Sequence, residues 1–227
     1  MTAISSLDVD GATVSWTRDG TIRGRPCLVL AHGAGAPMTS PFMAFVAERL
    51  ARRGLCVLRF NFPYMERASR EGRRRPPDAK PRLLDTWEAM LGVARRLRGH
   101  GPIVIGGKSM GGRIASMLAA DGRAEDVRGL VYFGYPLHPP SKPEKLRADH
   151  LTSIEVPQLF LSGTRDALAE PRLLRRVVKG LPRATLVALE GADHSLARSR
   201  RDPFAGADVW LDAAAAFAIE VARGDGR

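Results

Sequence analysis

The sequence predicts one α/β domain in which helices cover both faces of a mostly parallel sheet. Short β-branched and apolar runs alternate along the 227 residues with longer stretches whose apolar residues recur at helical spacing. Continuous apolar runs are typical of strands that are buried on both sides. Because a chain of this length can bury a single sizeable core, we expect one domain over residues 1–227.

The first predicted elements are an edge strand, a buried strand and a helix. Residues 12–18 predict the edge strand, and residues 26–31 predict a buried strand that leads into a glycine-rich turn. Ser40 can cap the helix that follows, and Gly54 ends it. The apolar side of this helix consists of Phe42, Phe45, Val46 and Leu50.

Two further strand–helix units complete the first half of the chain. Residues 55–60 predict a strand, and residues 82–98 predict a helix. The buried stripe of this helix consists of Leu83, Leu84, Trp87, Met90 and Leu91. The run 102–106 predicts a strand that glycines break next to Ser109, and residues 113–120 continue as a helix.

The second half adds strands at 129–133, 158–162 and 184–189 and helices at 171–179 and 207–222. The connection between residues 133 and 158 is the one long gap, and it contains several prolines. It is too short and too proline-rich for a large cap domain, although residues 142–150 can form a short helix. We therefore expect a comparatively open site.

Composition and cysteine usage exclude several classes of protein. No run of about 18 apolar residues is present, and residues 1–10 do not have the pattern of a secretory signal. We expect a cytoplasmic protein without membrane insertion. The two cysteines, Cys27 and Cys56, lie in predicted strands and are expected to be core thiols rather than a disulfide. No cofactor or metal is expected.

The net charge of +11 raises the question of a polyanionic partner. The basic residues are densest between 66 and 82, where Arg73, Arg74 and Arg75 are consecutive. This stretch has few aromatic residues and no recognisable nucleic-acid motif, so we expect a solvated loop and no nucleic-acid partner. Binding of an anionic substrate by this loop, by Lys108 or by Arg113 remains the alternative.

The strongest chemical signal is a Gly-x-Ser-x-Gly pattern at 107–111, between a predicted strand and a predicted helix. The sharp turn leaves space only for small residues beside the serine, here Gly107 and Gly111. It presents Ser109 at the carboxyl ends of the strands, where open α/β sheets bind ligands. The pattern therefore predicts Ser109 as a nucleophile. A glycine-rich turn without chemistry is the alternative for the motif alone.

A serine nucleophile needs a general base, which is usually a histidine. His194 follows the last predicted strand in a short polar loop, and we expect it to be this base. His100 lies in a helix-to-strand turn at the opposite edge. His138 and His150 lie in the long connection and are expected to be exposed.

The acid that orients the histidine is expected to be Asp166, which follows the penultimate strand. The chain order Ser, Asp, His is then the order of the hydrolases with a Gly-x-Ser-x-Gly turn. Asp193 is the nearest competitor, but neighbouring residues rarely aim their side chains at each other. A purely structural Asx turn is the alternative role for Asp166.

Attack on a carbonyl creates an oxyanion that backbone amides can stabilise. The residue after the nucleophile, Met110, is expected to supply one amide. The turn His32–Gly35 follows a buried strand, and the amide of Ala34 is expected to be the second donor. Gly33 and Gly35 would give this turn its shape, and a plain strand-exit turn is the alternative.

Together the turn at 32–35, the elbow at 107–111, Asp166 and His194 resemble the α/β-hydrolase superfamily over nearly the whole chain. The short Gly-Gly-Lys-Ser-Met-Gly-Gly elbow is similar to that of the small testis-expressed-type hydrolases and of the hydrolase-like domain of an NSL-complex subunit. The dienelactone-hydrolase-like branch is close to both. The resemblance implies a mostly parallel sheet of about seven or eight strands with one antiparallel strand near the N-terminus.

The resemblance and the motifs favour a serine hydrolase that acts on carboxylic ester or thioester bonds through an acyl-enzyme. A small-molecule ester or thioester is the expected partner. True dienelactone hydrolases use a cysteine where this chain has Ser109, so that activity is not expected. The alternative is a catalytically silent module that keeps the hydrolase shape and binds a partner, as the basic surface and the settings of some relatives suggest.

Overall fold

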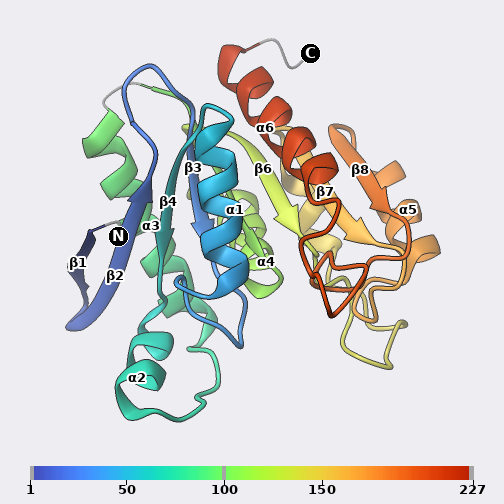
Figure 1. The fold of residues 1–227 in the computed structure, drawn as a ribbon, viewed down its shortest axis with the longest axis horizontal. Helices are drawn as coiled ribbons and strands as arrows, with labels where there is room; N and C mark the ends of the chain where they lie inside the picture. The colour runs from blue at the N-terminus through green and yellow to red at the C-terminus, as the bar shows by residue number, and fades with distance from the viewer. Residues whose placement is uncertain (1–2, 99–100, 225–227) are drawn as a thin grey trace.

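Within the described residues, eight strands form one sheet in the order β1-β2-β4-β3-β5-β6-β7-β8 (Figure 1). The computed structural model describes residues 3–98 and 101–224. The six strands β4, β3, β5, β6, β7 and β8 are mutually parallel, whereas β2 runs antiparallel to both of its neighbours, β1 and β4. The strands are β1 (Ile4–Val9), β2 (Ala12–Asp19), β3 (Cys27–Ala31), β4 (Cys56–Phe60), β5 (Ile103–Lys108), β6 (Val127–Phe133), β7 (Gln158–Gly163) and β8 (Ala184–Leu189).

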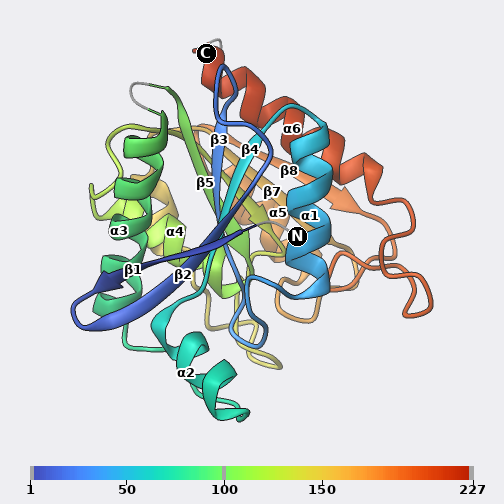
Figure 2. The same ribbon diagram turned by 60° about the vertical axis from the view of Figure 1, so that its left-hand side comes forward.

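Helices cover both faces of the sheet, which confirms the predicted layers (Figures 1 and 2). Helices α1 and α6 pack on one face, and their core includes Val46, Leu50, Trp210 and Leu211. Helices α3, α4 and α5 pack on the other face, where their buried residues belong to one core cluster that includes Trp87 of α3. The helices are α1 (Pro41–Arg52), α2 (Pro63–Glu71), α3 (Lys80–Arg98), α4 (Met110–Ala120), α5 (Pro171–Lys179) and α6 (Asp208–Arg223).

Strand β1 is an element that the sequence analysis missed. It forms a hairpin with β2, and the two residues between them, Asp10 and Gly11, both have positive φ angles of 49° and 73°. Asp-Gly is the dipeptide that two-residue hairpin turns prefer. The signal was therefore present in the sequence, next to a polar strand whose first residues are exposed.

The basic stretch 66–82 is not a loop throughout, which corrects the expectation of a solvated loop. Helix α2 includes its first six residues and begins at Pro63, a residue suited to the first helical position. Tyr64 and Met65 are buried under the helix, and Gly72 ends it in the left-handed conformation. Burial of these two side chains stabilises a short helix, which the many charged residues of the stretch made hard to predict from the sequence.

The long connection between β6 and β7 differs from prediction in two respects. Its short helix is a 3₁₀ turn, η1 (Asp149–Ser153), rather than a helix over 142–150. His138 is buried instead of exposed, and its Nε2 is satisfied by a hydrogen bond from the amide of Glu170 at 2.9 Å. His150 is half-buried. His100 lies outside the described residues.

The fold leaves the carboxyl ends of the parallel strands open, as expected for a chain without a large cap. In the described residues, only η1 and irregular chain connect β6 to β7, and α2 connects β4 to α3. Cys27 and Cys56 are free, buried and paired in register on β3 and β4, which confirms the prediction of core thiols. None of the helices described is both long and apolar enough to cross a membrane.

Candidate active site

Ser109 occupies a strained turn between β5 and α4. Its φ of 51° and ψ of −117° lie in a backbone region that residues other than glycine rarely adopt. The turn is held from both sides, since the amide of Ser109 donates to the carbonyl of Phe133 and its carbonyl accepts from the amide of Arg113. The serine is therefore presented at the carboxyl edge of the sheet with its backbone already restrained.

The two glycines beside the serine are required by close backbone contacts. A Cβ on Gly107 would lie 2.6 Å from the backbone of Gly111, and a Cβ on Gly111 would lie 2.5 Å from the carbonyl oxygen of His32. These contacts press the start of α4 against the end of β3. In contrast, a Cβ on Gly35 would meet no atom within 4 Å, and one on Gly33 would make only ordinary contacts.

We expect Gly111→Ala to lower the free energy of unfolding by about 1–3 kcal/mol, because the new methyl group must displace backbone rather than a side chain. Alanine also gains up to about 1 kcal/mol of helix propensity, and the clash outweighs this gain. Denaturant unfolding measures the difference. Gly35→Ala is the matched control and should leave stability unchanged or slightly higher; an equal loss in both variants would contradict the packing argument.

The structure brings the three predicted side chains into one hydrogen-bonded chain. Nε2 of His194 lies 2.8 Å from Oγ of Ser109. Nδ1 of the same ring lies 2.8 Å and 3.0 Å from the two carboxylate oxygens of Asp166. Asp166 is buried, whereas the histidine side chain is 26% exposed. The imidazole can therefore meet both the buried acid and a ligand in solvent.

The hydrogen bonds define the direction of proton transfer. A carboxylate only accepts hydrogen bonds, so Nδ1 of His194 carries a proton and donates a hydrogen bond to Asp166, which stays ionised. The unprotonated Nε2 then accepts from the hydroxyl of Ser109. This is the arrangement in which a neutral imidazole can remove the serine proton.

Asp166 makes the contacts expected for both of the roles that the sequence analysis weighed as alternatives. Its Oδ1 accepts a hydrogen bond from the amide of Leu168 at 2.8 Å in an Asx turn, and the same carboxylate contacts His194. Asp193 does not compete for the imidazole in the described structure. Its Oδ1 accepts from the amides of Ser195 and Ala197, and it shapes the loop that carries the histidine.

A second serine–histidine pair joins Ser116 of α4 to His150 of η1, but its hydrogen bonds run in the wrong direction for a nucleophile and its base. Oγ of Ser116 lies 2.8 Å from Nε2 of His150 and donates its own proton to the carbonyl of Arg113 at 2.7 Å. The histidine must therefore be the donor in this contact. Burial and the nearby charges of Arg113 and Lys80 lower the pKa of His150. No carboxylate among the described residues is hydrogen-bonded to its ring.

Lys108, inside the elbow, has a contact that the sequence did not reveal. Its Nζ donates to the carbonyl oxygen of His194 at 2.5 Å and lies 5.7 Å from the centre of the Phe42 ring. Gly134 leaves space for this contact, since a Cβ there would lie 2.6 Å from the same carbonyl oxygen. Burial lowers the pKa of Lys108 to about 8, and the carboxylates of Asp166 and Asp193 oppose this shift. The lysine thus joins the elbow to the histidine loop.

Gly163, at the end of β7, is another site residue that the sequence analysis missed. A Cβ there would lie 2.1 Å from the carbonyl oxygen of Ala192 and 2.6 Å from that of Asp193. The loop before His194 therefore packs directly on the end of β7, the strand that precedes Asp166. A glycine immediately after an apolar strand was the available signal.

The turn after β3 is held next to the elbow by a buried histidine. Nδ1 of His32 lies 2.7 Å from the carbonyl of Gly33, and Nε2 accepts from the amide of Phe62 at 3.1 Å. Burial lowers the pKa of His32 to about 4, so the ring stays neutral around pH 7. The hydroxyl of Tyr64 donates to the carbonyl of Ala34 at 3.1 Å. The carbonyl groups of Gly33 and Ala34 are thus held by hydrogen bonds to side chains of the protein.

The two amides expected to stabilise an oxyanion belong to these two neighbouring segments, Ala34 to the turn after β3 and Met110 to the elbow. Met110 is the first residue of α4, so its amide has no acceptor within the helix. No hydrogen bond from the amide of Ala34 is found among the described residues. In the described part of the chain, no group of three His, Cys, Asp or Glu side chains is placed to hold a metal ion.

The model of one protein family, the alpha/beta hydrolase domain, matches residues 24–222. Solved structures with the same fold include an Agrobacterium tumefaciens protein of unknown function, which is 16% identical, with a TM-score of 0.77 and coverage of 99% of this chain and 98% of that chain. Est1E from Butyrivibrio proteoclasticus is 17% identical, with a TM-score of 0.72 and coverage of 97% and 99%. Dienelactone hydrolase from Anabaena variabilis is 22% identical, with a TM-score of 0.68 and coverage of 97% and 95%.

Proposed function

Because this chain belongs to the alpha/beta hydrolase family, we propose that it is a serine hydrolase of carboxylic ester or thioester bonds. The family and the fold support hydrolysis in general. The proposal of a serine nucleophile rests on one observation above all, the continuous chain from Oγ of Ser109 through the imidazole of His194 to the carboxylate of Asp166. The open edge of the sheet around it is suited to a small-molecule substrate.

In the proposed reaction, Oγ of Ser109 attacks the substrate carbonyl carbon while Nε2 of His194 takes the hydroxyl proton. The charge that develops on the carbonyl oxygen is stabilised by the amides of Ala34 and Met110, each worth roughly 3–4 kcal/mol in comparable sites. The imidazolium is held by Asp166 and returns its proton to the leaving alcohol or thiol. An acyl-enzyme on Ser109 remains.

Water completes the cycle by the same chemistry in reverse. His194 takes a proton from the water as its oxygen adds to the acyl carbon. The intermediate then collapses, the imidazolium returns the proton to Oγ of Ser109, and the acid is released. The positive φ of Ser109 supports this role, because strained residues of this kind persist where the surrounding structure holds them in place.

A fluorophosphonate probe tests the nucleophile directly, with the adduct mapped by mass spectrometry. We expect a single adduct on Ser109 that is absent from the Ser109→Ala variant. Ser116→Ala is the matched control, because Ser116 also lies next to a histidine but donates its proton elsewhere. The control variant should be labelled like the wild type.

Two results would contradict the proposal. Labelling of Ser116 in place of Ser109 would move the nucleophile to the other pair. Absence of labelling in a folded wild-type protein would favour the catalytically silent binding module, and partner binding unaffected by Ser109→Ala would then be expected.

A further inference from the structure

A pocket of about 390 Å³ lies beside the glycine turn and is not used by the mechanism above. One wall is formed by Ala34 and Gly35, and the opposite side by Met65 and Ala68 of α2 together with the three arginines at 73–75. Its size lies within the range of about 300–1,000 Å³ typical of small-molecule sites. A larger surface pocket, of about 790 Å³, is lined by Arg95, Pro102 and Arg223 at the other end of the strands, remote from Ser109.

The pocket is joined to the nucleophile by a short piece of backbone. A Cβ on Gly33 would lie 3.6 Å from Cβ of Ser109, and the next two residues of the turn line the pocket. The wall opposite is fixed to the same turn, since Tyr64 donates to the carbonyl of Ala34 and the carboxylate of Asp78 accepts from the amide of Tyr64 at 2.8 Å. A group bound in the pocket would therefore keep a defined position relative to Ser109.

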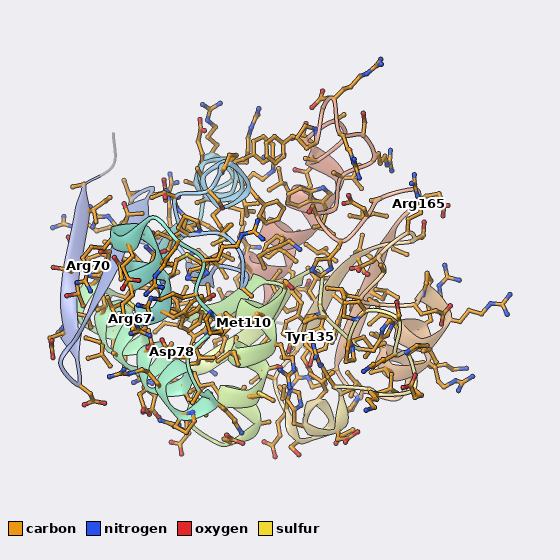
Figure 3. The ribbon with its side chains drawn as sticks, turned by 90° about the horizontal axis from the view of Figure 1, so that it is seen from below. Arg67, Arg70, Asp78, Met110, Tyr135 and Arg165 are labelled. Atoms are coloured by element: carbon orange, nitrogen blue, oxygen red, sulfur yellow. The ribbon has the colours of Figure 1, made fainter. Side chains whose placement is uncertain are left out.

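The strand order places the pocket and His194 on opposite sides of Ser109. The turn follows β3 and α2 follows β4, on one side of β5 and Ser109, whereas Asp166 and His194 follow β7 and β8 on the other side. Figure 3 shows Arg67, Arg70 and Asp78 on one side of Met110, and Tyr135 and Arg165 on the other. Since His194 protonates the leaving group, that group must lie toward the histidine. The acyl chain then extends toward the pocket.

The chemistry of the walls is mixed, with an apolar part and a cationic part. Met65 and Ala68, one helical turn apart, present an apolar surface suited to methylene groups. Glu71 accepts hydrogen bonds from Arg73 at 2.9 Å and from Arg75 at 2.6–2.8 Å, which holds these guanidinium groups and lowers the pKa of Glu71. Residues 71–75 thus contain one carboxylate and three guanidinium groups, and the segment keeps a net positive charge. Within the described residues, Arg74 has no hydrogen-bond or ion-pair partner.

On the basis of the proposed function, we propose that this pocket binds the acyl chain of a substrate that ends in a carboxylate, such as a monoester of a short dicarboxylic acid. The methylene groups would contact Met65 and Ala68, and the terminal carboxylate would bind the arginines at 73–75. A guanidinium group offers paired donors that match a carboxylate. In this proposal, the positive charge of the arginines at 73–75 serves to select substrates that carry a carboxylate.

The test compares two substrates that differ only in this charge, the mono-p-nitrophenyl ester of glutaric acid and the methyl ester of that compound. We expect the wild type to prefer the acid in kcat/KM. Replacing Arg73, Arg74 and Arg75 together by Gln should lower the preference at least about tenfold, because charge-assisted hydrogen bonds are lost. Arg74→Gln alone should lower it in part and leaves the contacts of Glu71 unchanged.

A matched control separates binding from long-range attraction. Arg172, Arg175 and Arg176 are exposed on α5, which lies between β7 and β8 along the chain. Replacing them by Gln removes the same charge on the opposite side of β5 from the pocket. This control should keep the preference within about twofold. A preference that is unchanged in the pocket variant, or that falls equally in the control, would overturn the proposal.

The two proposals can fail separately. Hydrolysis of the neutral methyl ester that depends on Ser109 reports the proposed function, whatever the acid preference. If the wild type hydrolysed neither ester, the pocket would be judged by calorimetry with monomethyl glutarate and dimethyl glutarate. Tighter binding of the acid that is lost in the pocket variant would support the subsite, and equal dissociation constants would overturn it.

Discussion

Ser109→Ala should lower kcat/KM for small activated esters by about 10⁴- to 10⁶-fold, as expected for removal of the nucleophile of a serine hydrolase. His194 and Asp166 keep their hydrogen bond in this variant, but no oxygen remains to form the acyl-enzyme. In the proposed mechanism the amides of Ala34 and Met110 would still polarise the substrate carbonyl for attack by water, so a small residual rate should remain. The loss should appear in kcat, because the hydroxyl acts mainly in the transition state.

The measurement is steady-state hydrolysis of a p-nitrophenyl ester by the wild type, Ser109→Ala and the control Ser116→Ala. The control should retain most of the activity. Thermal unfolding of each variant checks the fold, and Ser109→Ala should unfold at nearly the wild-type temperature, since it keeps a Cβ in the strained turn. Equal hydrolysis by wild type and Ser109→Ala would exclude Ser109 as the nucleophile.

Asp166→Asn should lower kcat by about 10⁴-fold, through the tautomer of the histidine. The amide oxygen of asparagine can still accept from the amide of Leu168, so the Asx turn is kept. Its NH₂ group, however, donates to Nδ1 of His194 where the carboxylate accepts. The ring proton then moves to Nε2, and the imidazole can no longer remove the proton of Ser109.

Asp193→Asn is the matched control for this prediction. Asparagine can accept the two amide hydrogen bonds that hold the histidine loop, and the residue has no hydrogen bond to the ring. We expect less than a tenfold change in kcat. A large loss in Asp193→Asn together with a small loss in Asp166→Asn would reverse the assignment of the acid. Similar small losses in both would argue against a carboxylate-oriented base.

Features that depend on local backbone chemistry could be predicted from the sequence. The pattern at 107–111 specifies a sharp turn, because only glycine tolerates the contacts at 2.5–2.6 Å on either side of Ser109. The apolar runs of the central strands indicate burial on both faces without reference to any partner. Positions at strand ends also follow from order along the chain, so Ser109, Asp166 and His194 could all be assigned to one edge of a parallel sheet.

Features that depend on distant contacts could not be predicted in this way. The buried ring of His138 accepts a hydrogen bond from the amide of Glu170, 32 residues away. The burial of Tyr64 and Met65 stabilises helix α2 in a part of the sequence that is rich in charged residues. The hydrogen bond from Lys108 to the carbonyl of His194 joins residues 86 apart.

The sequence by itself determined the elements, their order and the residue types available for chemistry, because backbone preferences and apolar periodicity act over a few neighbouring residues. Only the tertiary structure decided which side chains meet. It aims Asp166, and not Asp193, at the imidazole, and it turns the proton of Ser116 away from His150. Hydrogen bonds require positions within a few tenths of an ångström, and those positions are set by the packing of the whole sheet.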